Sequence, residues 1–367
     1  MRSLYLSIFS AMLGLGIVAP LMPIYARELG ATTLILGFIY SSFSIARTTF
    51  TPIVGFVSDK FGRKSFILLG LISYSVISIL YIFARDPGDL IVIRFFHGLS
   101  SAMVIPCAMA YVSQLAPRGE EGRTISSFNM ALLGGIGFGP FLGGVIKDVF
   151  GFKLAFISMS ILTILAFFAA ISIPNIKDRS EFRLKIKRPL ISIMIFRFST
   201  AIRLALIIAF FPVLINLSGY QVGLVISTIV LMNAFSQKFF GRFVDRFDRV
   251  RLAIFGSFVS TVLFMTLPFT KEFKIVLMIA TFMGIFNGLS MCSASAIAVS
   301  LGRIYGHGTV MGLFNTSMGL AMIVSPIVAG FIADFTNLVV SFVSLGMFSL
   351  ACLFIFYILF KLDGEVL

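Results

Sequence analysis

The chain has 367 residues, of which 59% are hydrophobic and only 12% are charged, and its mean hydropathy is +1.06. A soluble domain carries about 25% charged residues, so this composition excludes an ordinary water-soluble globule and indicates a surface that faces lipid. A net charge of +14 would suggest nucleic acid as the partner of a soluble protein, but membrane proteins gather Lys and Arg in their cytoplasmic loops. We therefore expect a lipid bilayer around the chain and no nucleic acid.

Twelve apolar stretches are long enough to cross a bilayer as helices, for which about 20 residues suffice. The first begins close to Met1 and continues past Gly16 to Pro20 without a small-residue cleavage site, so we interpret it as a retained span rather than a signal peptide. The predicted fold is an all-α integral membrane protein. The spans are predicted at 4–26, 33–57, 65–84, 90–114, 124–146, 152–173, 190–216, 220–240, 251–270, 274–300, 309–333 and 337–360.

One long polar segment, PNIKDRSEFRLKIKRP at 174–189, separates the first six spans from the second six. We expect it to be a cytoplasmic linker between one bundle at 1–173 and another at 190–367. With the N-terminus inside, nineteen of the 29 Lys and Arg fall on the cytoplasmic side, six fall outside and four lie within spans. This excess predicts a multi-pass protein of the cell membrane with both termini in the cytoplasm.

The second half of the sequence repeats the first at a constant offset. Six spans lie between the two copies, and because six is an even number both halves keep the same orientation. The repeat therefore predicts two parallel six-helix bundles related by a pseudo-twofold axis along the membrane normal. The symmetry also suggests a structural role for two carboxylates at equivalent outer span ends. The matched pairs include Gly55 with Gly241, Asp59 with Asp245, Arg63 with Arg249, Pro140 with Pro326, and Asp148 with Asp334.

The loop GFVSDKFGRK, residues 55–64, lies between the second and third predicted spans. By its residues alone it is a positively charged cytoplasmic loop, in which Gly55 permits close contact between helices and Gly62 permits a tight turn. Its spacing also resembles the signature loop of the major facilitator superfamily. In that family the loop carboxylate meets the positive N-terminus of a helix in the opposite half and helps to latch one conformation. The resemblance implies a latch formed by Gly55, Asp59, Lys60, Gly62, Arg63 and Lys64, with the start of the eleventh span near Thr309 as its target.

The second copy of the loop, GRFVDRFDRV at 241–250, keeps only part of the pattern. Asp248 stands where the first copy has Gly62, so we expect its turn to differ. The resemblance extends the latch to the residues that remain, Gly241, Asp245, Arg246 and Arg249.

The fifth predicted span contains GGIGFGPFLGG at 134–144. Its small residues let two backbones approach closely, and its proline is expected to bend the helix. Tight packing without any bearing on the direction of transport is one interpretation. The segment also resembles the glycine–proline motif of the superfamily's exporters, although Ser126 stands where that pattern has an upstream glycine. The matching residues are Gly135, Gly139, Pro140, Gly143 and Gly144, and the second half repeats the proline as Pro326.

Two further segments resemble the superfamily's twelve-span drug–proton antiporters. Pro20 and Pro23 lie at the end of the first span, as in that group. In RFFHGLSSA at 94–102, Arg94 is placed as in the family's arginine motif, while His97 stands where a glutamine is commoner.

Four arginines lie within the predicted spans, where an ionisable side chain is costly and usually faces a cavity or a partner. Since the family's first, fourth, seventh and tenth spans line the central path, the resemblance makes Arg94 and Arg203 candidates for a positively biased cavity. His97 is a candidate for proton coupling, because imidazole changes charge near neutral pH. The alternatives are a structural histidine, and arginines that snorkel or bond backbone carbonyls, above all Arg197. All fifteen Asp and Glu fall in loops or at span ends, which weakens the case for a cationic substrate.

The leading hypothesis is a secondary transporter that exports small amphipathic or drug-like compounds by alternating access, with protons as a candidate coupling ion. Transport or exchange of an organic anion is the alternative within this class, and a non-transporting membrane sensor is the alternative outside it. No phosphate-binding loop of the G-x-x-x-x-G-K-[ST] type occurs, so we do not expect ATP to drive it. Cys107, Cys292 and Cys352 lie in apolar stretches and indicate neither disulfides nor a metal site. We expect a monomer without enzymatic activity, cofactor or metal.

Overall fold

The structure, a computed structural model, describes residues 2–116, 121–174, 188–215, 217–244 and 246–362. Within these ranges the chain is almost entirely helical and forms no strand. This follows from the composition, because a backbone in lipid must satisfy its hydrogen bonds within each segment. The predicted all-α membrane class is confirmed.

The helices of the first half begin and end at polar or turn-forming residues. Thr32 and Asp86 accept hydrogen bonds from the first turns of the helices that they precede, as good N-caps do. Pro20 lies in the turn after the first helix, and Pro23 lies in the first turn of the second. The elements are α1 (Arg2–Val18), α2 (Met22–Glu28), α3 (Thr33–Phe61), α4 (Arg63–Leu80), the 3₁₀ turn η1 (Tyr81–Phe83), α5 (Pro87–Leu115) and α6 (Glu121–Ile171).

The second half repeats this pattern of long helices with short connections. As in the first half, one helix continues directly into a 3₁₀ turn, at the position equivalent to η1 in the sequence repeat. The elements are α7 (Arg188–Leu214), α8 (Gly219–Val244), α9 (Arg249–Thr266), η2 (Leu267–Phe269), α10 (Phe273–Tyr305), α11 (His307–Phe335) and α12 (Leu338–Leu362).

Ten segments of the described residues are long and apolar enough to cross a membrane. Two features account for the difference from the twelve predicted spans. α6 runs through both the fifth and sixth predicted spans, but its backbone breaks at Gly151, where φ is +81°, an angle that glycine adopts readily. Pro140 lies within the helical backbone of α6, and the bend expected there stays a prediction. α3 covers the second predicted span but is not among the ten, because hydroxyl residues and Arg47 fill its middle.

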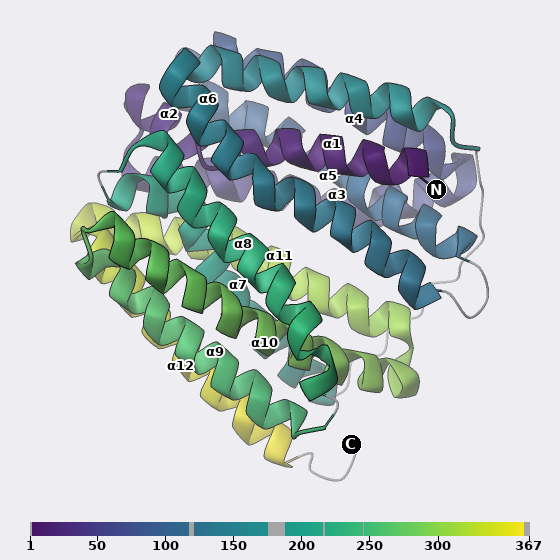
Figure 1. Ribbon diagram of the computed structural model, residues 1–367, viewed down its shortest axis with the longest axis vertical. Helices are drawn as coiled ribbons and strands as arrows, with labels where there is room; N and C mark the ends of the chain where they lie inside the picture. The colour runs from purple at the N-terminus through teal and green to yellow at the C-terminus, as the bar shows by residue number, and fades with distance from the viewer. Residues whose placement is uncertain (1, 117–120, 175–187, 216, 245, 363–367) are drawn as a thin grey trace. The chain divides into compact units, whose positions relative to one another are not determined.

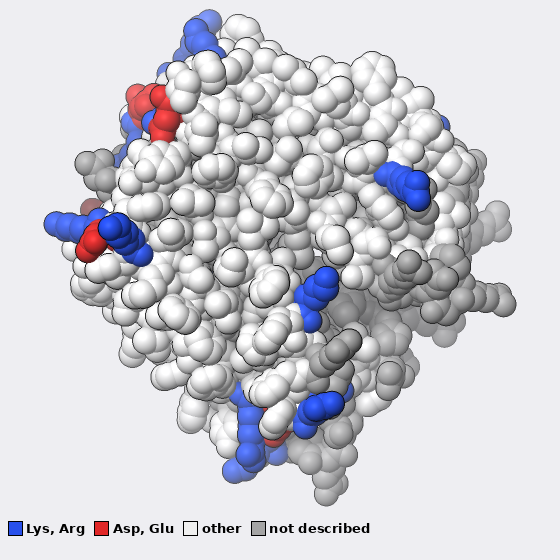
Figure 2. Space-filling model, viewed as in Figure 1, with Lys and Arg blue, Asp and Glu red and all other residues white. Residues whose placement is uncertain are grey.

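The exposed surface of the helices is apolar. Phe168 on α6 and Phe354 on α12 are 64% and 63% exposed, and many other large apolar side chains are exposed in the same way. On the face shown in Figure 2, charged side chains occupy a few small patches and leave broad areas without charge. Soluble proteins rarely expose apolar patches beyond a few hundred Å². This surface is therefore suited to lipid.

The helices group into two compact units (Figure 1). The first unit contains the described residues up to 174 together with 217–227, which include the first turns of α8. Within it α1 packs along α6, α3 packs along α5, and α4 packs against both α5 and α6. The other contains 188–215 and the described residues from 228 onward; in it α9 packs along α10, and α7 packs against α11 and α12. The predicted linker at 174–189 falls almost wholly outside the described residues, so the domain boundaries stay predictions.

α1 and α6 approach so closely at the glycines of α6 that no side chain fits there. A Cβ built at Gly139 would lie 2.5 Å from the Cα of Gly16, and one built at Gly135 would lie 2.6 Å from the carbonyl oxygen of Phe9. Gly143 meets the backbone of α1 in the same way. Residues spaced by four lie on one face of a helix, so the glycines form a continuous stripe. The close approach predicted from the glycine-rich span is present.

The core of the second unit joins four of its helices. Phe196 of α7 meets Phe356 of α12 with ring centroids 4.9 Å apart, and Ala253 of α9, Ala294 of α10 and Phe314 of α11 belong to the same buried cluster. In lipid, such a cluster stabilises the unit through close packing, because the tails around it are as apolar as the side chains.

We predict that Gly139→Ala lowers the free energy of unfolding by about 1–3 kcal/mol, because the added methyl group forces two backbones apart. Thermal unfolding of the purified protein in detergent would measure this. Gly312→Ala on α11 is the matched control, since a Cβ there meets nothing within 4 Å, and it should be neutral or slightly stabilising. Equal stability of the two variants would contradict the tight α1–α6 contact.

Candidate functional site

A single glycine connects α3 to α4. Gly62 has φ +107° and ψ 126°, and its N–H donates to the carbonyl oxygen of Ser58 at 2.8 Å. A side chain would be strained at this φ, so the turn depends on glycine. The short connection holds Asp59, near the end of α3, beside Arg63, the first residue of α4.

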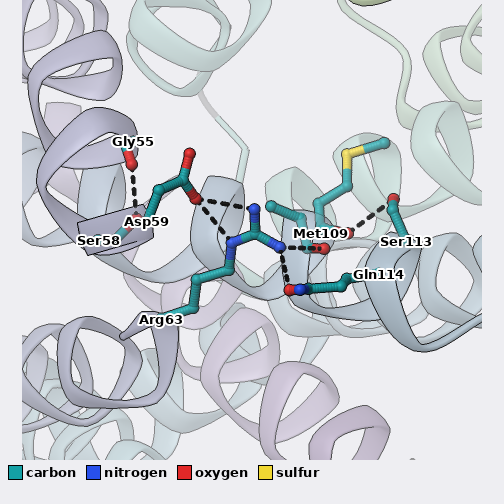
Figure 3. A network of polar contacts seen from close by, with 8 residues as sticks. Gly55, Ser58, Asp59, Arg63, Met109, Ser113 and Gln114 are labelled. Carbon is teal, nitrogen blue, oxygen red and sulfur yellow. Dashed lines mark hydrogen bonds and ion pairs between the residues drawn. The ribbon is translucent and has the colours of Figure 1, made fainter. Parts of the chain in front are cut away.

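Arg63 lies at the centre of a polar network that joins three helices (Figure 3). Its Nε and Nη2 donate to Oδ1 of Asp59 at 2.9 Å and 2.8 Å. Its Nη1 donates to the side-chain oxygen of Gln114 at 2.7 Å and to the carbonyl oxygen of Ala110 at 2.9 Å, both on α5. Charge-assisted bonds of this kind are strong and fix geometry. The Arg63 side chain is 6% exposed and that of Asp59 is 23% exposed, so the carboxylate stays partly accessible while the guanidinium does not.

The other members of the loop lie around this network. Lys64 donates from Nζ to the carbonyl oxygen of Ile171, at the end of α6, at 2.6 Å. Lys60 is exposed, and its Nζ lies 5.7 Å from the ring centre of Phe61. A Cβ built at Gly55 would meet nothing within 4 Å, so the close helix contact that we expected there is wrong for this structure.

The turn of the second copy differs from that of the first, as its sequence predicted. Asp248, in the place of Gly62, has φ −60° and caps α9 by accepting from the N–H groups of Val250 and Arg251 at 2.9 Å and 3.1 Å. An N-cap carboxylate therefore replaces the positive-φ glycine.

The described residues of the second copy show one bond comparable to those of the first network. Arg249 donates to the Ser300 hydroxyl of α10 at 3.1 Å. Arg246 is exposed, Gly241 has open space around it, and Asp245 lies outside the described residues.

Arg94 of α5 lies buried inside the first unit, 4% exposed. The carbon at the centre of its guanidinium lies 4.9 Å from the ring centres of both Tyr40 and Phe43 of α3. Two aromatic faces stabilise a cation electrostatically. Among the described residues no carboxylate pairs with Arg94, and its Nε has no hydrogen-bond partner. The positive charge is therefore shielded by rings but not neutralised.

His97 lies almost one turn after Arg94 and is fully buried. Its Nδ1 lies 2.8 Å from the Tyr81 hydroxyl, and the rings of Tyr74 and Phe43 meet it edge to face with centroids 5.1 Å and 5.4 Å away. Within the described part of the chain its Nε2 has no partner. The aromatic packing favours a structural role.

Arg203 of α7 is enclosed in the second unit, 3% exposed. Its Nη1 donates to the hydroxyls of Thr261 on α9 and Ser349 on α12 at 2.7 Å and 3.1 Å, and its Nη2 donates to the amide oxygen of Asn287 on α10 at 3.4 Å. Three neutral oxygens thus bind this cation and tie four helices together, which favours a structural role.

Arg197 of α7 contradicts our expectation. Among the described residues it bonds no backbone carbonyl; its guanidinium contacts the sulfur atoms of Met291 and Met318 and the ring of Phe314.

Asp148 joins α6 to the start of α8. Its Oδ1 accepts from the N–H of Gly219 at 3.1 Å, and its Oδ2 accepts from the N–H of Tyr220 at 2.7 Å. A carboxylate at a helix N-terminus satisfies free N–H groups and the helix dipole together. Gly144 permits this contact, because a Cβ there would overlap the backbone of Gly219.

α8 also continues along α6 beyond this cap. A Cβ built at Gly223 would overlap the backbone at Pro140, and the N–H of Phe141 donates to the Ser227 hydroxyl at 3.0 Å. The glycine–proline segment therefore has two contact faces, one for α1 and one for α8. Pro326, its repeat, lies within α11.

Sequence reasoning did not find the neighbours of the buried cations. The neighbours lie far along the chain from the residues that they contact, and no sequence spacing links the two. They are Tyr40, Tyr81, Asn287 and the two methionines that contact Arg197. Among the described residues, no group of three His, Cys, Asp or Glu could hold a metal, and the three cysteines form no disulfide.

Comparison with known proteins places this geometry among membrane transporters. A profile of the Major Facilitator Superfamily matches residues 4–213 and 190–366. The chain is similar to "uncharacterized MFS-type transporter MJ1560" of Methanocaldococcus jannaschii, with 30% identity covering 97% of this chain and 96% of the relative. It is also similar to the quinolone resistance protein NorA of Staphylococcus aureus, with 26% identity over 90% of this chain and 89% of NorA.

Two solved structures share the fold at low sequence identity. The nucleoside transporter NupG superimposes with a TM-score of 0.81 at 13% identity, covering 98% of this chain and 99% of NupG. The human organic anion transporter MFSD10 superimposes with a TM-score of 0.66 at 17% identity, covering 97% and 98%.

We predict that Asp148→Ala weakens the attachment of α8 to α6 and lowers the free energy of unfolding by about 0.5–2 kcal/mol, the usual effect of losing an N-cap. Chemical denaturation in mixed micelles would measure it. Lys147→Gln is the control, because Lys147 contacts the same carboxylate at 3.3 Å but does not bond α8. A larger loss in the lysine variant would contradict the assigned role of Asp148.

Proposed function

The chain belongs to the Major Facilitator Superfamily, and we propose that it is a secondary active transporter that exports small amphipathic, drug-like compounds across the cell membrane. The observation that carries the proposal of export is the 135–144 segment of α6, which packs backbone to backbone against both α1 and the start of α8. That segment resembles the exporters' glycine–proline motif. The similarity to NorA, a quinolone resistance protein, supports the same substrate class.

Alternating access requires elements that hold one conformation and then release it. We propose that Asp59, oriented by Arg63, is such an element and acts on the N-terminus of α11, near Thr309. The bonds of Arg63 to Asp59, Gln114 and Ala110 support this, because they fix the carboxylate while leaving it partly accessible. Gly241, Asp245, Arg246 and Arg249 would form the second latch.

A second candidate is the transport of an organic anion. It is favoured by Arg94, Arg197 and Arg203, none of which pairs with a carboxylate among the described residues. An uncompensated buried cation attracts a substrate that carries negative charge.

The remaining parts of the proposal concern coupling and assembly. We propose protons as the coupling ion, with His97 as the group that binds them, a monomer as the working unit, and both termini in the cytoplasm. The free Nε2 of His97 supports the first of these, and the distribution of Lys and Arg supports the last.

We predict that Asp59→Asn folds and inserts normally but transports at least about tenfold more slowly, because a neutral side chain loses about 1.4 kcal/mol or more of latch stabilisation. Efflux from proteoliposomes would measure the rate, and labelling of single cysteines would report the inward and outward populations. Asp86→Asn, the same change at the N-cap of α5, is the control and should retain transport. Wild-type flux from Asp59→Asn would refute the latch.

Proteoliposome flux also decides between the two substrate classes. We predict transport of a fluorescent amphipathic cation such as ethidium, accelerated by an imposed proton gradient. Flux of an aromatic carboxylate without flux of the dye would establish the organic-anion candidate instead. Flux of neither, under gradients of either sign, would favour a sensor.

A further inference from the structure

Arg197 occupies an unusual environment at the junction of α7, α10 and α11. Its Nη1 lies 3.1 Å from Sδ of Met291, its Nη2 lies 2.7 Å from Sδ of Met318, and its central carbon lies 4.9 Å from the ring centre of Phe314. Its buried Nε has no hydrogen-bond partner among the described residues. Not one oxygen atom accepts a hydrogen bond from this guanidinium within the described part of the chain.

These contacts leave the cation poorly satisfied. A guanidinium carries five N–H donors in a planar fork, and a thioether sulfur is only a weak acceptor. A carboxylate, sulfonate or phosphate oxygen forms much stronger, charge-assisted bonds with the same fork, commonly two at once. The cost of keeping a charge at membrane depth would fall when such a group binds.

Arg203 and Arg94, which also lie within predicted spans, are satisfied differently. Arg203 bonds three neutral oxygens and is 3% exposed, while Arg94 lies between two aromatic rings and is 4% exposed. Arg197, Met291 and Met318 are all only half-buried. Arg197 therefore combines weak internal partners with incomplete enclosure by its own unit.

The lining of the site suits an apolar body beside the negative group. Methionine side chains are flexible and polarisable, so they can move aside and pack against varied shapes. Phe314, 6% exposed, provides a rigid aromatic floor, and its ring already lies against the guanidinium.

We infer that Arg197 is an anion-binding residue of the second unit, at which the carboxylate, sulfonate or phosphate of an otherwise apolar small molecule displaces the sulfurs of Met291 and Met318. The apolar body then packs against these methionines and Phe314. This inference rests on the second candidate function, the transport of an organic anion, because it names the chemical group by which such a compound is recognised. Neutral and cationic analogues of the same shape gain nothing from the guanidinium and bind weakly.

Binding to the full-length protein in lipid nanodiscs tests the inference. The probes are radiolabelled benzoate, its neutral amide benzamide and the cation benzylammonium. We expect benzoate to bind at least about tenfold more tightly than either analogue, a difference of one charge-assisted contact. Arg197→Gln should abolish this preference, and Arg197→Lys should restore part of it. Lys153→Gln, which removes an exposed cation from the other unit, is the control and should leave benzoate binding unchanged.

A measurement on the wild-type protein guards against a variant that does not fold. Phenylglyoxal modifies accessible arginines, and mass spectrometry locates the sites. We expect it to modify Arg197, and benzoate but not benzamide to protect that residue. Equal binding of benzoate and benzamide, unchanged preference in Arg197→Gln, or no protection of Arg197 would each overturn the inference.

Dye and benzoate flux in proteoliposomes separate this inference from the proposed function. Dye efflux without benzoate binding would support the proposed transport of drug-like compounds and refute the anion site. Benzoate binding that depends on Arg197, with no flux of either compound, would support the site and refute transport.

Discussion

The constraint on which the rest of the structure depends is that polar groups inside the helices must find partners within the protein. The exposed faces of the helices carry phenylalanine and aliphatic side chains, which offer no hydrogen bonds, and lipid tails offer none either. Buried serines respond by bonding across helices: Ser78 donates to the carbonyl oxygen of Phe156 at 2.6 Å, and Ser199 to that of Ser349 at 2.9 Å. Hydroxyl groups therefore connect helices that packing alone would hold loosely.

The buried arginines show three different answers to this constraint. Arg203 donates hydrogen bonds to neutral oxygens of three neighbouring helices. Arg94 lies against two aromatic rings, and Arg197 contacts two sulfur atoms and one ring. None takes a carboxylate among the described residues. Among the described residues, arginine–carboxylate pairs occur instead at the ends of helices, where Arg63 pairs with Asp59 and Arg251 pairs with Asp248. The sequence separates its internal cations from its carboxylates, and the interior keeps a positive character as a result.

Much of the fold was predictable, because it follows from local properties of the chain. Apolar length located the helices, and the glycine spacing at 135, 139 and 143 predicted a close helix contact without identifying α1 as the partner. The replacement of Gly62 by Asp248 predicted a different second turn, since only glycine tolerates φ +107°.

The errors and omissions concern what a single sequence leaves open. Gly55 was expected in a tight contact yet has open space around it. The partners of Arg94, Arg197 and His97 could not be predicted, because which helix faces which depends on packing between segments far apart in the chain. The roles of the loop and of the buried cations stay predictions.

The backbone contact between α1 and α6 limits how this protein can move. Helices that meet through side chains can slide past each other, because the side chains change rotamer. Gly16, Gly135 and Gly139 have no side chain to adjust, so main chains in direct contact cannot slide in this way. α1 and the first part of α6 should consequently swing as one lever. Sliding between helices during a transport cycle is then confined to interfaces formed by side chains. In the first unit these interfaces lie among α3, α4 and α5.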